Sequence, residues 1–187
     1  MPCSKSLWAL CPVLIMAVVA MLVSATDAYA CQRASPVSNV EMVKQADAIV
    51  RVMAVEYARP PRDPSMRTTG LPDSMIRFRV LEVIRGSLLR ESSQLILPGY
   101  IVDHDDYNDE APPYNFVRPN GRSGSCFANS YRSGGQFLLI LKREQPLGYT
   151  ADWYALGPTN EQLHSADDPW LLWVREQAKS QAASKGE

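Results

Sequence analysis

The order of apolar and polar residues along the chain predicts a β-rich domain with one helix before the strands and one after them. Five segments have the composition of strands and are bounded by glycine or proline turns, namely 48–57, 75–84, 95–97, 136–142 and 149–156. The segment 136–142 is an unbroken apolar run, which favours a strand buried on both faces. Segment 75–84 instead alternates apolar and charged residues, as a half-buried strand does.

Two capping signals set the predicted helices. Ser38 and Glu41 form a capping box, which predicts a short helix ending near Ala46. Asp168 followed by Pro169 predicts a second helix that ends near Ser180. Its one apolar face should pack against the strands and consists of Trp170, Trp173 and Val174. The polar residues 181–187 are expected to form a disordered tail.

Strands that follow one another without intervening helices indicate an antiparallel barrel rather than a parallel sheet. The predicted fold class is all-β with flanking helices: a five-stranded antiparallel OB-fold barrel with a short N-terminal helix and a C-terminal helix. One such domain should occupy residues 31–180.

The first 30 residues have the layout of a secretory signal peptide. Lys5 precedes an apolar run over 7–23, and the small-x-small sequence Ala28-Tyr29-Ala30 predicts cleavage before Cys31. Two alternatives stay open: cleavage that leaves an N-terminus at Thr26, and lipid attachment to Cys31. We therefore expect a secreted or periplasmic protein, with an outer-membrane lipoprotein as the alternative and membrane contact only if Cys31 is lipidated.

The charge of the chain argues against one class of partner, and its cysteine content predicts a disulfide. With 19 basic and 20 acidic residues the net charge is −1, which argues against a nucleic-acid partner. Cys3 and Cys11 fall within the predicted signal peptide, so Cys31 and Cys126 would remain, and one disulfide is expected in an oxidising compartment.

Three features in order resemble netrin-like modules, and most of all the N-terminal domain of the tissue inhibitors of metalloproteinases. They are a mature N-terminal Cys31, the strand–turn–strand pattern of 75–98, and the cysteine, glycine-containing loop and apolar strand of 126–140. The resemblance implies an OB-fold and a disulfide between Cys31 and Cys126. It also implies a binding edge of Cys31, Gln32, Gly124 and Ser125. In that family the terminal amine and carbonyl chelate the catalytic zinc of a metalloprotease.

The chain departs from the family in its opening residues. Gln32 and Arg33 follow Cys31 where the inhibitors have Cys-x-Cys. We therefore expect a secreted, non-enzymatic binding module for a secreted or envelope protein. Metalloprotease inhibition through Cys31 is the alternative, and a lipid-anchored envelope component is the second.

Motifs for catalysis are lacking: the sequence has no Gly-x-Ser-x-Gly, His-Glu-x-x-His or P-loop, so we expect no enzyme and no cofactor. The acidic segment 103–110 is expected to be solvated, with weak calcium binding as its alternative, and no metal site is predicted. It opens a polar loop over 103–125, a length typical of functional or disordered loops.

Overall fold

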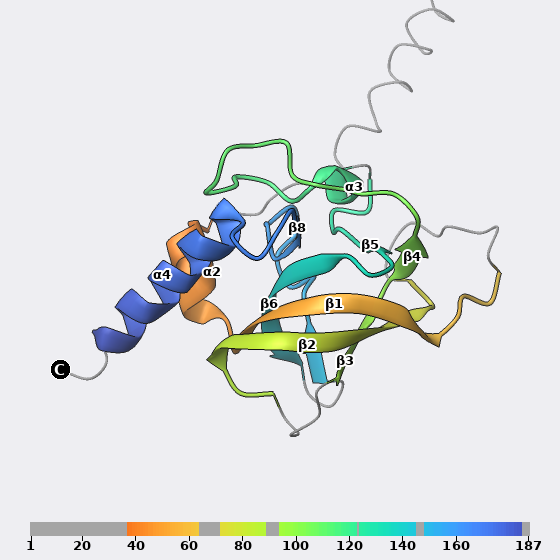
Figure 1. Cartoon of the computed structure of the whole chain (residues 1–187), viewed down its shortest axis with the longest axis horizontal. Helices are drawn as coiled ribbons and strands as arrows, with labels where there is room; N and C mark the ends of the chain where they lie inside the picture. Colours follow the sequence, from red (N-terminus) through yellow and green to blue (C-terminus); the bar gives the residue numbers. More distant parts are fainter. Residues whose placement is uncertain (1–36, 64–71, 89–93, 123, 145–147, 185–187) are drawn as a thin grey trace, which may run out of the picture. The chain divides into compact units, whose positions relative to one another are not determined.

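Antiparallel strands are the main regular elements of the computed structural model, which describes residues 37–63, 72–88, 94–122, 124–144 and 148–184 (Figure 1). These residues belong to the larger of two units, Arg33–Glu187, whereas the smaller unit, Met1–Gln32, lies outside the described ranges. The predicted signal peptide therefore falls outside them as well. Within these ranges no helix combines the length and apolar character needed to cross a membrane.

The main sheet contains six strands: β1 (Ala48–Arg59), β2 (Met75–Gly86), β3 (Gln94–Pro98), β6 (Gln136–Glu144), β7 (Gly148–Thr150) and β8 (Asn160–Leu163). Its order is β3-β2-β1-β6-β7, and β8 also pairs with β6. All of these pairs are antiparallel. A separate parallel pair consists of β4 (Tyr100–Val102) and β5 (Ser130–Arg132).

The prediction of a mainly β protein with an antiparallel sheet and flanking helices is confirmed, but the pairs between the described strands do not close into a barrel. Four predicted strands occur within two residues of their expected bounds. The fifth, predicted over 149–156, is wrong beyond Thr150. The reason is that Leu156 uses its backbone groups to bond Val117 and Cys126 instead of a neighbouring strand.

Strand β6 separates two hydrophobic cores. Its residues alternate between them: Phe137, Leu139 and Leu141 face one core, and Leu138 and Ile140 face the other. All five side chains are fully buried, which confirms the predicted strand with two buried faces. The first core is enclosed by the strands and the second by two helices.

Helices α2 (Asn39–Gln45) and α4 (Pro169–Ala183) lie side by side over the second core (Figure 1). Their predicted caps are confirmed, because Ser38 Oγ accepts from Glu41 N and Asp168 Oδ1 accepts from Trp170 N. The predicted disordered tail over 181–187 is wrong for residues 181–183, which continue α4, whereas residues 185–187 lie outside the described ranges. Gln181 Oε1 accepts a hydrogen bond from Arg85, and Gln181 Nε2 donates to Val40 O, which holds this last turn in place.

The apolar face predicted for the second helix is buried as expected. Trp170 is fully buried, and its ring lies 5.1 Å from those of Tyr114 and Trp173. Val174 is also fully buried, while Trp173 packs at the edge of the same core.

Because Trp170 fills the centre of the second core, Trp170→Ala should lower the free energy of unfolding by about 3–5 kcal/mol. Leu172, 48% exposed on the same helix, is the matched control, and Leu172→Ala should change it by no more than about 0.5 kcal/mol. Urea denaturation of the two variants measures both values. Similar losses in both would contradict this role for Trp170.

Candidate functional site

The residues expected to form the binding edge lie only partly within the described ranges. Gly124 is exposed, and Ser125 and Cys126 are partly exposed in the turn that leads towards β5. Cys126 is disulfide-bonded, and as the only cysteine in the described ranges it has its partner outside them. Cys31 and Gln32 also lie outside them, so the pairing of Cys31 with Cys126 stays a prediction.

The turn that contains Cys126 is held by backbone hydrogen bonds from two other segments. Leu156 N donates to Cys126 O at 2.7 Å, and Val117 N donates to Leu156 O at 2.9 Å. Cys126 and Leu156 both have positive φ angles, 64° and 59°, which non-glycine residues seldom adopt. Three segments distant in sequence therefore meet at this edge and fix one another's backbone.

The four-residue helix α3 (Pro119–Arg122) packs closely beneath the same turn. A Cβ atom at Gly121 would lie 2.7 Å from Ala128 N and 2.6 Å from Val117 Cγ1, so only glycine allows this approach. Asn120 extends the contact, because its Oδ1 accepts hydrogen bonds from Asn129 N at 2.9 Å and from Ser130 N at 3.1 Å.

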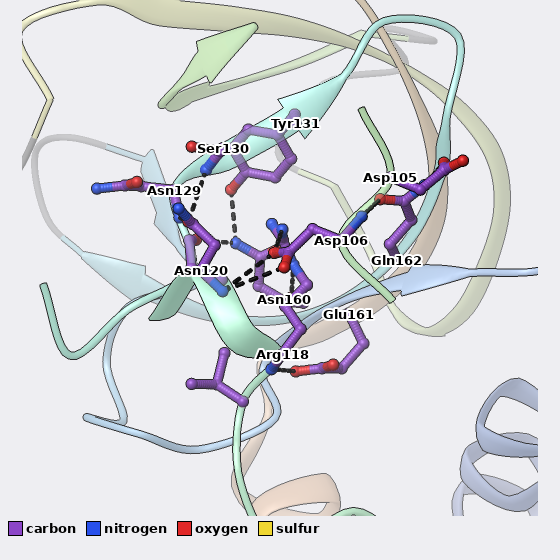
Figure 2. A network of polar contacts seen from close by, with 12 residues as sticks. Asp105, Asp106, Arg118, Asn120, Asn129, Ser130, Tyr131, Asn160, Glu161 and Gln162 are labelled. Carbon is purple, nitrogen blue, oxygen red and sulfur yellow. Dashed lines mark hydrogen bonds and ion pairs between the residues drawn. The ribbon is translucent and has the colours of Figure 1, made fainter. Parts of the chain in front are cut away.

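A network of buried polar side chains lies behind this edge (Figure 2). Arg118, whose side chain is fully buried, is its centre. Its Nη1 donates to Asp106 Oδ2 at 2.5 Å, and its Nε donates to Asn160 O at 2.9 Å. Its Nη2 donates to Asn160 Oδ1 at 3.2 Å. We call Asp106, Asn108, Arg118, Asn160 and Glu161 the Arg118 network.

Asp106 connects the network to α3. Besides its ion pair with Arg118, its carboxylate accepts from Asn120 N at 3.1 Å and 3.3 Å. Asn120 in turn holds the start of β5, so Asp106, Asn120 and the backbone of Asn129 form a continuous series of hydrogen bonds. The loop over 103–125 is thereby joined to the strand that follows the cysteine turn.

Glu161 is the surplus acid of the network. Its carboxylate accepts from Asn108 Nδ2 at 2.9 Å and from Arg118 N at 3.1 Å, while Asp106 takes the direct ion pair with the guanidinium. One cation thus faces two carboxylates. Burial raises the pKa of Glu161 to about 8, and the Arg118 charge and these hydrogen bonds only partly oppose that rise.

The prediction that the acidic segment 103–110 is solvated is wrong for Asn108, which is buried, and for Asp106, which is largely buried, whereas Asp105 is exposed and ion-paired. Asp105 accepts two hydrogen bonds from Arg132 Nη1, at 2.8 and 2.9 Å, and one from Gln162. Asp106 and Asn108 join the Arg118 network. His104, 64% exposed, contacts only the exposed Asp103 among the described residues. Nowhere in the ranges covered by the structure do three or more His, Cys, Asp or Glu side chains gather as metal ligands.

The two histidines have different surroundings. His164 stacks on Tyr107 with ring centroids 4.0 Å apart, and its Nδ1 lies 3.1 Å from Asp168 Oδ2. Tyr107 itself forms an isolated parallel bridge with Gln162. These contacts tie the loop to β8 and to the start of α4, which is a structural role.

No family model, no curated protein and no solved structure matches this chain.

Because the folded state holds a proton on Glu161 that the unfolded chain releases above its ordinary pKa of 4.5, raising the pH from about 5 to about 8 should cost stability. Glu161→Gln removes this group from titration, so the variant should lose less stability over that interval than the unaltered protein. Urea denaturation at both pH values measures the difference. The exposed Glu176, changed to Gln, is the control and should keep the original pH dependence; an unchanged slope in Glu161→Gln would contradict the assignment.

Proposed function

We propose that this protein is a secreted, non-enzymatic binding module for a protein ligand, and that residues 124–127 form its contact edge. The observation that carries the proposal is an exposed turn whose backbone is held by Leu156 and by Asn120, and Asn120 is bonded in turn to Asp106 of the Arg118 network. Gly124 is exposed at its start, while Cys126 O and Asn129 N are bonded to Leu156 and Asn120.

An edge that is already fixed favours binding, because it loses little conformational entropy when a ligand binds. The disulfide at Cys126 restrains the edge further. The nearest groups of the Arg118 network are buried, and they stabilise the backbone instead of contacting a ligand. This division between rigid support and exposed contact is typical of loops that bind partners.

Phe116 supplies an apolar contact beside the contact edge. Its side chain is 44% exposed, and the residue after it, Val117, is linked to Cys126 through Leu156. Aromatic side chains, phenylalanine among them, are enriched at protein interfaces relative to the rest of the surface. We therefore include Phe116 in the proposed binding surface.

The finer fold assignment, an OB-fold related to netrin-like modules, belongs to the same proposal. Two observations support it: the parallel pairing of β4 with β5, and the parallel bridge between Tyr107 and Gln162. The bridge joins the segment after β4 to β8, a strand that pairs with β6 and not with β3, and β4 pairs outside the main sheet. That arrangement suits a partly open barrel of the OB type.

A photoreactive phenylalanine analogue placed at position 116 tests the binding surface. In the native host it should give one discrete adduct with a protein, and excess unlabelled protein should suppress it, because a specific site saturates. The same analogue at Leu172, which is 48% exposed on α4, is the matched control and should give none. Equal adducts at both positions, or none at either, would contradict the proposed surface.

Metalloprotease inhibition is the second candidate, and the disulfide at Cys126 is the observation that favours it. A disulfide to an N-terminal Cys31 would hold the terminal amine beside the contact edge. An α-amine has a pKa of about 7.7–8.0, so a fraction of the amines is neutral near pH 7 and can bind zinc. Gln32 would then point towards the specificity pocket of the protease.

Two forms of the protein test this second candidate: one that begins at Cys31 and one that retains Ala30. Only the first should inhibit zinc metalloproteases, because the added residue removes the chelating amine. Intact mass spectrometry of the native protein must also show an unmodified Cys31 at the N-terminus. An acylated Cys31 would instead support the lipid-anchored component, and an N-terminus at Thr26 would exclude both chelation and the anchor.

A further inference from the structure

A small pocket opens beside the contact edge, between the end of β3 and the segment after β7. Its walls are mainly apolar and come from Leu97, Pro98, Phe127 and Ala128. Phe127 belongs to the contact edge, so a ligand bound there would also lie at the mouth of the pocket. The cavity volume is about 20 Å³, on the scale of a single water-sized group.

Asp152 is the charged residue of this pocket. One of its carboxylate oxygens accepts a hydrogen bond from Thr150 Oγ1, and within the described ranges no Lys, Arg or His forms an ion pair with it. Burial raises the pKa of the Asp152 carboxyl above its ordinary value, and the like charge of Glu144 adds to that rise. A half-buried carboxylate among apolar walls usually has a cation beside it, and Asp152 has none among the described residues.

Asn160 and Tyr131, two other polar residues of the pocket, already have partners. Asn160 Nδ2 donates to Ala128 O at 2.5 Å and to the Tyr131 hydroxyl at 2.7 Å, and Asn160 Oδ1 accepts from Arg118. These bonds fix the floor of the pocket and leave it little capacity to recognise a ligand. Recognition of charge must therefore come from Asp152.

We infer that this pocket receives the ammonium group of a lysine side chain presented by the protein ligand. An ammonium is close in size to the single water-sized group that this cavity admits, and its compact charge suits a lone carboxylate, whereas the planar guanidinium of arginine suits a fork of acceptors. The stem would contact Leu97 and Phe127, and the ammonium would donate to the Asp152 carboxylate. This inference rests on the proposed function only for the source of the lysine.

Nuclear magnetic resonance titration of the protein with Nα-acetyl-lysine methylamide tests the pocket directly. Saturable shifts are expected for the backbone amides of Ala128, Ala151 and Asp152. The matched neutral probe, Nα-acetyl-norleucine methylamide, has a similar aliphatic stem without the ammonium and should bind at least about tenfold more weakly. Equal binding of the two probes, or no saturable shift with the lysine probe, would overturn the inference.

Asp152→Asn keeps the shape of the side chain and removes its charge. It should weaken binding of the lysine probe by about tenfold or more, while Asp103→Asn, at a fully exposed carboxylate, should leave it unchanged. Unchanged binding in Asp152→Asn would overturn the assignment. The probes do not require the natural ligand, so lysine binding without any adduct at position 116 would retain the pocket and refute the proposed function alone.

Discussion

The buried guanidinium of Arg118 is the constraint on which the exposed side of this protein depends. A charge with no solvent exposure must be matched by partners that stay in place, because an unpaired buried charge costs several kcal/mol. Asp106 supplies the opposite charge and Asn160 supplies two acceptors. The guanidinium also lies over the rings of Tyr131 and Phe137, at 5.5 and 5.3 Å from their centroids. Lysine could not reproduce this set, since it lacks the planar fork of donors.

The contact edge and the pocket share this support. Asn160 bonds both Arg118 and Ala128, so the guanidinium is one side chain away from the wall of the pocket. Asp106 reaches the start of β5 through Asn120, just after the cysteine turn in the chain. Displacing Arg118 would therefore loosen the edge and the pocket together. A binding surface built from these two features would behave as one rigid unit.

Sequence patterns were sufficient for the parts of the fold that depend on local preference or apolar periodicity. The unbroken run of β6, the alternating run of β2 and the caps at Ser38 and Asp168 all have signals that a few neighbouring residues carry. Strand β8 has no such signal, because Asn160, Glu161 and Gln162 are polar residues of the kind that normally stay exposed. They are buried only because partners far away in the sequence, Arg118 and Asp105 among them, satisfy them. Neither the Arg118 network nor the pocket at Asp152 could be found without these long-range contacts, and the closed barrel was inferred from a number of strands that the structure does not reproduce.

Two regions of the protein are held together in different ways. Beneath α2 and α4 the core is apolar and centred on Trp170, and such packing stabilises a fold without demanding one exact placement of each group. Beneath the cysteine turn, directional hydrogen bonds replace much of that packing. A buried ion pair often adds little net stability compared with apolar residues of the same volume, yet it is costly to break. The Arg118 network therefore fixes the positions of the backbone segments around it more than it adds to the free energy of unfolding. An exposed edge with a fixed backbone can bind a ligand without first becoming ordered. The proposed contact edge and the lysine pocket both lie beside this network, where side chains hold the backbone through hydrogen bonds.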